Sequence, residues 1–134
     1  MEHLALDRVR SIQFCVDGAV GMPMSTTASR VTARLLDHDR RQIGEPSASA
    51  VSHPDSPVAS PIFDLQASWR GNMLSPTITI VCRIDTLEKP NLLPKCVGFA
   101  VLKLCVDSDG IQPSPAASSK QVYLNAGQYL LPIV

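Results

Sequence analysis

Alternating apolar and polar residues in short runs leave this chain of 134 residues few possible folds. Turn-forming residues separate the runs roughly every ten positions, and no segment sustains the 3.6-residue apolar period of an amphipathic helix. This pattern is typical of an antiparallel β-sandwich, because each strand can then turn one apolar face to a shared core. We therefore predict an all-β fold, a sandwich of about eight strands that occupies residues 1–134 as a single domain.

The alternation locates the expected strands. In residues 77–85 the apolar side chains share one face and β-branched residues dominate. Residues 96–107 are apolar on both faces, which predicts a central strand. The polar cluster 37–41 predicts the tip of a hairpin whose return arm includes Ile43. The other elements expected are strands at 9–16, 30–35 and 62–69, a closing pair at 121–124 and 129–134, and a helical turn at 4–8.

Two segments rich in serine and proline interrupt the strands, at residues 45–61 and 110–120. Such sequences favour exposed, flexible loops, because they offer few apolar side chains to anchor them. Long loops without structure of their own are uncommon in compact domains. We interpret the first of them as an insertion rather than as a functional element.

Composition narrows the class of partner. The chain has 12 basic and 12 acidic side chains, so its net charge of zero provides no global field that would attract nucleic acid. With 45% hydrophobic residues it can form a sizeable core, which argues against disorder of the whole chain. No apolar run approaches the roughly 20 residues of a membrane helix, and the first residues lack the basic start of a secretory signal. We expect a cytoplasmic protein that does not bind nucleic acid.

The four cysteines contain no C-x-x-C pair, and three of them lie in apolar, strand-like runs. This placement predicts buried free thiols in a reducing compartment. A disulfide framework is the alternative, although a chain of this length and apolar content does not require one. The residues concerned are Cys15, Cys82, Cys96 and Cys105.

No segment carries a recognisable reaction chemistry. The run Asp107–Gly110 resembles the start of a calcium loop, but the later positions lack the required glycine and bidentate glutamate, so we expect an Asp-Gly turn. Asp37, His38 and Asp39 are residue types that bind metal ions, but an extended chain would point adjacent side chains to opposite faces. They would therefore not converge on one metal ion. Motifs for nucleophilic catalysis and phosphate binding are missing. We predict no catalytic activity, no metal or other cofactor, and no small-molecule substrate.

Six residues are candidates for contact with a partner: Met22, Met24, Arg30, Arg34, Arg40 and Arg41. The two methionines flank a proline in the first predicted loop, where soft apolar side chains could enter a groove or a membrane. Packing over the end of the sandwich is the equal alternative. The arginines of the predicted strand share one face, and with those of the hairpin tip they could form a modest positive surface. A solvated outer face is the simpler interpretation of these charges.

Several motifs occur in the order of a C2 domain. Residues 12–23 resemble the first C2 strand with its A-x-G-L-P loop, and residues 29–36 resemble the strand that follows. Residues 76–85 resemble the long strand before the third C2 loop, and residues 97–104 are similar to the V-G-x-A-x-L-x-L strand after it. Residues 124–132 resemble the closing L-N-x-G-x-x-x-L-P of C2-like domains in ciliary and centrosomal coiled-coil proteins. The resemblance covers nearly the whole chain.

The resemblance implies a degenerate C2 domain. Calcium-binding members place several aspartates in the first and third loops, whereas residues 21–27 contain no carboxylate. In the third loop Asp85 matches one ligand position, but Leu87 stands in the place of its partner and Glu88 is a poor substitute. Too few oxygens would converge for a calcium site of roughly six to eight ligands.

These features predict a non-catalytic protein–protein interaction module of a larger cytoskeletal or ciliary scaffold protein, located in the cytoplasm and associated with the cytoskeleton or cilium. The alternative is a calcium-independent peripheral membrane module, in which the candidate arginines bind anionic head groups and the methionines act as a wedge. Calcium sensing is the third interpretation, and it predicts a melting temperature that rises with calcium.

Overall fold

The computed structural model describes residues 4–22, 26–52, 59–88, 93–118 and 120–134. Within these ranges the regular structure is almost entirely β, which confirms the predicted fold class. The strands are β1 (Ser11–Gly18), β2 (Thr26–Leu36), β3 (Gln42–Ala48), β4 (Ile62–Arg70), β5 (Thr79–Glu88), β6 (Leu93–Lys103), β7 (Cys105–Val106) and β8 (Tyr123–Leu124). Two three-residue 3-10 helices, η1 (Leu6–Arg8) and η2 (Gly71–Met73), complete the set.

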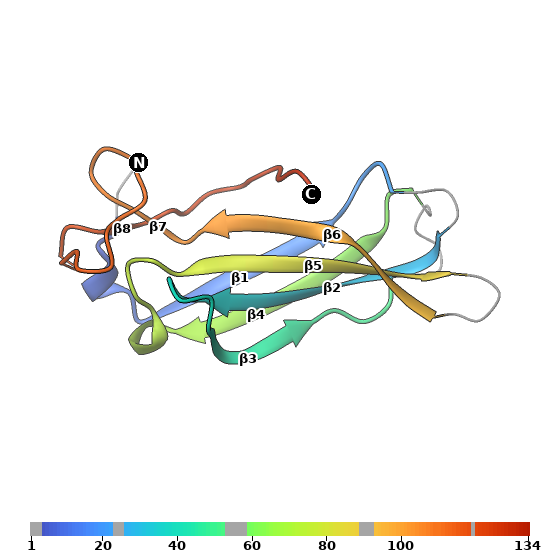
Figure 1. Ribbon diagram of the computed structural model, residues 1–134, viewed down its shortest axis with the longest axis horizontal. Helices are drawn as coiled ribbons and strands as arrows, with labels where there is room; N and C mark the ends of the chain where they lie inside the picture. The colour runs from blue at the N-terminus through green and yellow to red at the C-terminus, as the bar shows by residue number, and fades with distance from the viewer. Residues whose placement is uncertain (1–3, 23–25, 53–58, 89–92, 119) are drawn as a thin grey trace.

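Two antiparallel sheets face each other in a sandwich (Figure 1). The broader sheet has four strands in the order β3-β2-β5-β6, and the narrower one pairs β1 with β4. At one end of the molecule β7 and β8 form a small third sheet. The sandwich is therefore uneven, with a broad layer packed over a narrow one.

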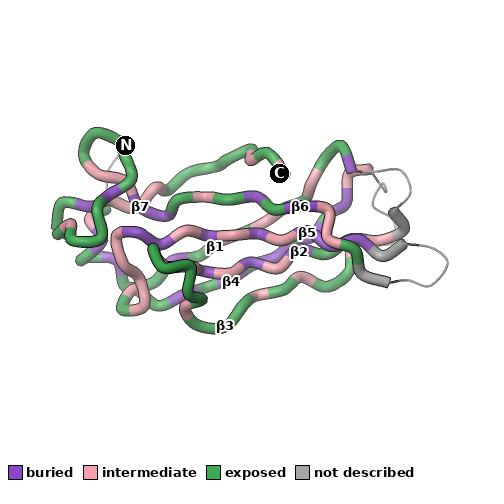
Figure 2. The backbone as a smooth tube through the Cα atoms, in the orientation of Figure 1, coloured by how far each residue is buried: buried purple, intermediate pink, exposed green. Residues whose placement is uncertain are grey.

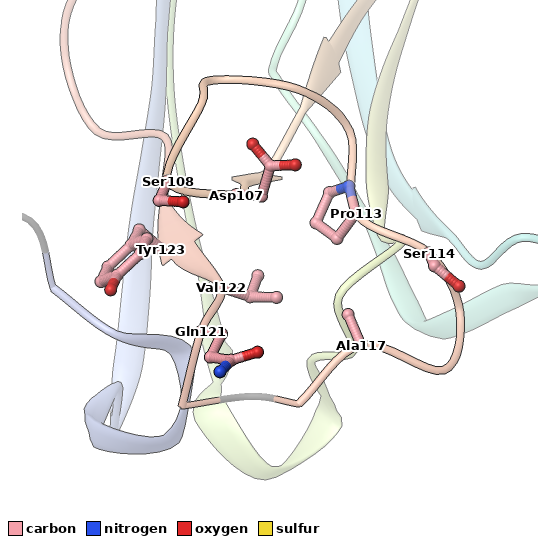
Figure 3. Close-up of a pocket in the computed structure, with 8 residues that line it drawn as sticks. All are labelled: Asp107, Ser108, Pro113, Ser114, Ala117, Gln121, Val122 and Tyr123. Atoms are coloured by element: carbon pink, nitrogen blue, oxygen red, sulfur yellow. The ribbon is translucent and has the colours of Figure 1, made fainter.

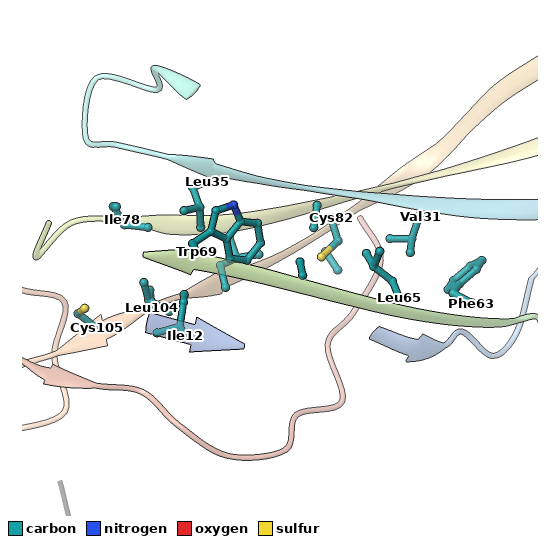
Figure 4. Packing of buried hydrophobic residues seen from close by; sticks show 14 of the residues in the cluster. Ile12, Val31, Leu35, Phe63, Leu65, Trp69, Ile78, Cys82, Leu104 and Cys105 are labelled. Atoms are coloured by element: carbon teal, nitrogen blue, oxygen red, sulfur yellow. The ribbon is translucent and has the colours of Figure 1, made fainter. Parts of the chain in front are cut away.

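The core fills the space between the two layers. Along β4 every second residue is buried, as the alternating colours of Figure 2 show. The residues that this strand contributes include Phe63, Leu65 and Trp69, and those of the broad sheet include Leu35 and Ile78. Figure 4 shows the Trp69 ring directed from β4 toward the broad sheet. Burial of these apolar side chains from both layers is what holds the sandwich together.

The predicted hairpin is confirmed. β2 and β3 pair from Leu36 and Gln42 onward, and the charged cluster forms the tip between them. In the tip the Oδ1 atom of Asp37 accepts hydrogen bonds from the backbone N–H groups of Asp39 and Arg41, each at 2.9 Å. An aspartate that satisfies the backbone of a tight turn in this way explains why the polar cluster reverses the chain.

The prediction of a central strand at residues 96–107 is wrong. β6 is an edge strand of the broad sheet and ends at Lys103, and the following residue, Leu104, donates its N–H to the carbonyl oxygen of Ile78 at 3.1 Å. The side chains of Phe99 and Val101 point away from the core and remain partly in solvent. Apolar residues on both faces therefore do not reflect burial on both faces in this strand.

The predicted closing pair is also corrected. β8 pairs with β7 rather than with residues 129–134, which are not assigned to a strand. Instead, Val134 exchanges two backbone hydrogen bonds with Phe99 of β6, both at 2.9 Å. The last residues thus return to the broad sheet, and Figure 1 shows this segment running alongside β6.

The first serine- and proline-rich loop begins later than predicted, because residues 45–48 belong to β3. The chain then follows the edge of β2 through two serines. Ser49 donates its N–H to the carbonyl oxygen of Val31 and accepts the Val31 N–H on its hydroxyl oxygen. Ser52 pairs in the same way with Ser29. Residues 53–58 lie outside the described ranges.

The second loop rich in serine and proline, at residues 110–120, consists of turns in its described part. The hydroxyl groups of Ser114 and Ser118 accept backbone hydrogen bonds there.

Candidate interaction surface

The outward side chains of β2, β5 and β6 form one surface of the broad sheet, which we call the outer face. On β2 the outward residues alternate with the buried residues Val31, Ala33 and Leu35. The outward side chains therefore point away from the core. Strand register arranges the outer face in four rows across the three strands. The rows are Arg30–Asp85–Cys96, Thr32–Arg83–Phe99, Arg34–Val81–Val101 and Leu36–Thr79–Lys103.

An apolar strip lies within these rows. Phe99 is 40% exposed and Val101 is 49% exposed, and the half-buried Val81 stands directly opposite Val101. Single exposed apolar residues are normal on a protein surface, but neighbouring ones on one sheet face are a common mark of an interaction site. The strip is therefore the part of the outer face that most favours contact with a partner.

Basic side chains surround the apolar strip. Between the first and the last row the outward residues of the three strands include Arg30, Arg34, Arg83 and Lys103 as cations and Asp85 as the one carboxylate, a net charge of +3. β3, at the opposite edge of the sheet, contributes Glu45 as its one charged residue, so the surface remains positive. A chain that is neutral overall thus gathers positive charge on one face.

The carboxylate of this face is already engaged. Asp85 is buried, and its Oδ1 atom accepts a hydrogen bond from Nε of Arg83 at 3.0 Å. This hydrogen bond, together with the charge of the carboxylate, raises the pKa of Arg83 above its ordinary value. Because Asp85 is covered, a partner would meet the guanidinium and ammonium groups more readily than the carboxylate.

Arg30 and Arg34 occupy the outer face together, in agreement with their predicted position on one side of a strand. Arg40 and Arg41 do not join them. They lie beyond the last row in the hairpin tip, next to acidic residues of the same turn. The expected four-arginine surface is therefore divided in two.

Arg83 and Lys103 also belong to this surface, although the sequence pattern does not predict them there. The alternation of residues 77–85 does place Arg83 opposite the apolar face. Only the register between β5 and β6, however, shows that Arg83 lies opposite Phe99 and that Lys103 closes the last row. Which residues are neighbours across the sheet depends on the pairing of distant segments, and the pattern of a single strand does not show it.

Met22 is in the core rather than at an exposed loop tip. It is 4% exposed, and its N–H donates a hydrogen bond to the carbonyl oxygen of Ala59 at 2.9 Å. Of the two predicted roles, the structure supports packing against the sandwich. Met24 lies outside the described residues.

All four cysteines are free, which confirms the predicted thiols, but they differ in exposure. Burial raises the pKa of both Cys82 and Cys105 to about 11, so these thiols remain protonated and unreactive at neutral pH. Cys96 is half-buried, and Cys15 is exposed on β1. The prediction of burial is therefore wrong for Cys15.

A shallow pocket of about 470 Å³ lies under the loop that joins β7 to β8 (Figure 3). Its one charged lining residue is Asp107, whose Oδ1 atom accepts the backbone N–H groups of Asp109 and Ile111 at 2.8 and 2.9 Å. Gly110 has a φ of 75°, which completes the predicted Asp-Gly turn. Asp107 thus stabilises the turn that lines the pocket.

The described part of the chain contains no group of three or more His, Cys, Asp or Glu residues that could hold a metal ion. Neither of its two short helices could cross a bilayer.

No protein-family model matches the chain, and no curated protein is significantly similar to it.

Proposed function

We propose that the protein is a non-catalytic protein–protein interaction module and that it binds its partner through the outer face of the broad sheet. The observation that carries this proposal is the exposure of Phe99 and Val101 next to basic side chains. Interfaces combine an apolar centre with a polar rim, and arginine and aromatic residues are enriched in them. The outer face has this composition.

An anionic membrane is the other surface that a basic face could contact. Peripheral membrane binding gains strength when apolar side chains insert beside the basic ones. Of the two methionines considered for that role, Met22 is buried in the core. The residues that accompany the basic groups on the outer face lie on strands of the sheet rather than on a projecting loop. This arrangement favours a protein partner.

The C2-like identity, and the assignment to a ciliary or cytoskeletal scaffold, belong to the same proposal. Their support is the order of the motifs along the chain, from the first strand to the closing L-N-x-G segment. A β-sandwich that serves only for contact, with no catalytic machinery, agrees with a role as one module of a larger scaffold.

The proposal is tested by replacing the two exposed residues of the apolar strip with polar ones. The variant combines Phe99→Ser with Val101→Thr, and the matched control is Ile62→Ser, which removes an exposed apolar residue of the narrow sheet. Proteins captured from native cell extract by the wild type should be lost with the outer-face variant and retained with the control. Equal capture by all three proteins would refute the outer face as the binding surface.

Co-sedimentation with vesicles of phosphatidylserine and phosphatidylcholine separates protein from membrane binding. A protein-interaction module should remain in the supernatant at physiological salt. Sedimentation that increases with the anionic lipid and decreases with salt would instead support the membrane alternative.

A further inference from the structure

The edge of β6 that faces away from β5 is a second feature of the broad sheet. The N–H and C=O groups of Phe99 point across this edge, since both form hydrogen bonds with Val134. Successive residues of a strand alternate in direction, so the corresponding groups of Val101 and Lys103 point the same way. The carbonyl oxygen of Lys103 accepts a hydrogen bond from Nδ2 of Asn125 at 3.0 Å, in agreement with this direction.

Residues 125–134 therefore form a strap that is attached to the edge at both ends. Along β6 the distance from Phe99 to Lys103 is roughly 13 Å, because a strand rises about 3.3 Å per residue. The strap has more residues than this span needs and runs alongside β6 between its two attachments, where Leu131 packs against the core (Figure 1). Among the described residues, Val134 makes the only backbone-to-backbone hydrogen bonds across this edge of β6.

The end of the strap is seated as a short strand would be. Ile133 packs against the core over Gly98, whose missing side chain leaves it room, since a Cβ atom there would lie 2.7 Å from Cγ2 of Ile133. The next residue, Val134, is 82% exposed. One side chain directed inward and the next outward is the alternation of an added β-strand.

We propose that the edge of β6 from Phe99 to Lys103 binds an extended, acidic segment of a protein partner, which displaces Ile133 and Val134 and joins the broad sheet as an additional strand. This inference rests on the proposed function and names the partner's chemistry. Strand addition at an open edge supplies main-chain hydrogen bonds, and alternate side chains supply specificity.

Ile133 indicates what the inward side chains of such a segment should be, because it already occupies the space above Gly98. These residues should be apolar. The outward side chains would lie next to Phe99, Val101 and Lys103, on the face that carries a net charge of +3. Glutamate or aspartate at those positions would complement that charge, whereas a second copy of this chain would bring another positive face.

The strap lowers the apparent affinity of the partner. A binding site that is covered most of the time binds more weakly, in proportion to the fraction of molecules in which it is open. The last residues of the strap are fixed by the two backbone hydrogen bonds of Val134 and by the partly buried side chains of Leu131 and Ile133, few contacts compared with those of a paired strand. Weakening the strap should therefore tighten binding.

The probe is an acetylated and amidated peptide of about seven residues that alternates glutamate with valine, a length that spans one strand. Its binding is measured by fluorescence anisotropy to the wild type and to a strap variant that combines Ile133→Ser with Val134→Pro. We expect the strap variant to bind at least about tenfold more tightly. The amide hydrogen of Val101 should become protected from exchange when the peptide is bound.

Three controls define the site. A peptide that alternates lysine with valine should not bind, because its charge is reversed. Val101→Pro, added to the strap variant, should abolish binding, since it removes an N–H that points away from β5 and leaves the ladder to β5 intact. Thermal unfolding of each variant confirms that the sandwich is still folded.

The outcomes separate this inference from the proposed function. If the strap variant does not bind the acidic peptide at about 1 mM, or binds the basic one equally well, the acidic strand is refuted. If a native partner is lost with Phe99→Ser and Val101→Thr but retained with Val101→Pro, the outer face stands and strand addition falls. A dimer of the strap variant that excludes the peptide would instead identify a second copy as the occupant.

Discussion

Asp85 differs in position from what the sequence predicts. The C2 resemblance places it at a ligand position of the third loop, whereas in the structure it lies within β5, which continues to Glu88. In the structure it is buried and accepts a hydrogen bond from Arg83, two residues earlier on the same strand. The spacing that brings them together is visible in the sequence, because residues i and i+2 of a strand share a face. The burial that makes Asp85 structural depends on β2 and β6, which only the fold supplies.

The two buried thiols predict a loss of stability at alkaline pH. An unfolded cysteine ionises near pH 9, whereas Cys82 and Cys105 hold their protons until about 11 in the folded protein. The unfolded state therefore binds fewer protons between these values, and the free energy of unfolding should fall as the pH rises, by at most roughly 1.4 kcal/mol per pH unit for each thiol. Urea unfolding measured from pH 7 to 11 tests this.

The double variant Cys82→Ala and Cys105→Ala is the control, because the remaining titrating groups are the same in both proteins. Its stability should decrease less steeply above pH 9 than that of the wild type. Parallel curves for the two proteins would contradict the assignment of buried, protonated thiols.

The elements differ in how much of them the sequence predicts. β4 is evident from its alternation because each of its two faces has one environment, core or solvent. The misplacement of β6 has a physical reason: Phe99 and Val101 lie at a sheet edge, where apolar residues are retained without being buried. The second half of β3, residues 45–48, is not predicted because it contains Pro46, which an edge strand tolerates since it needs no N–H there for a ladder.

The extension of β3 along β2 depends on two serine hydroxyl groups. Val31 is fully buried, and its N–H donates to the hydroxyl oxygen of Ser49 at 3.0 Å. Ser49→Ala would leave this N–H without its acceptor and should reduce the free energy of unfolding by about 1–2 kcal/mol. Chemical denaturation measures the change, and Ser68→Ala, at an exposed position of β4, should have no comparable effect. An equal loss in both variants would show that the hydroxyl of Ser49 is not needed.

At the scale of the whole molecule, the layered arrangement could be predicted but its unevenness could not. Recurrent turns and alternation require two apolar faces to pack together, and that is the sandwich. How strands are shared between the layers depends on pairings between distant segments, such as β1 with β4 and β2 with β5. The composition of the outer face follows from those pairings. The sequence alone therefore predicts only the part of the candidate site that lies on β2, with Arg30 and Arg34.

One core shared by both layers should make unfolding cooperative. Leu35, from the broad sheet, is fully buried, and Trp69 contributes its ring from the narrow one. Leu35→Ala should lower the free energy of unfolding by about 3 kcal/mol, since it leaves a cavity between the layers. Trp69 fluorescence and far-ultraviolet circular dichroism should give coincident urea transitions in both proteins. Separate transitions would mean that the two sheets unfold independently.

The two edges of the broad sheet, β3 and β6, differ in how well they could pair with a further strand. β3 carries Pro46, a register break opposite β2 and Gly44 at a φ of 69°, all of which interrupt regular pairing with a further strand. β6 has no such interruption between Phe99 and Lys103. Within the broad sheet, the strand addition proposed above is therefore expected at β6 and not at β3. A partner bound in that way would meet one such edge per broad sheet, so we expect one acidic segment per broad sheet.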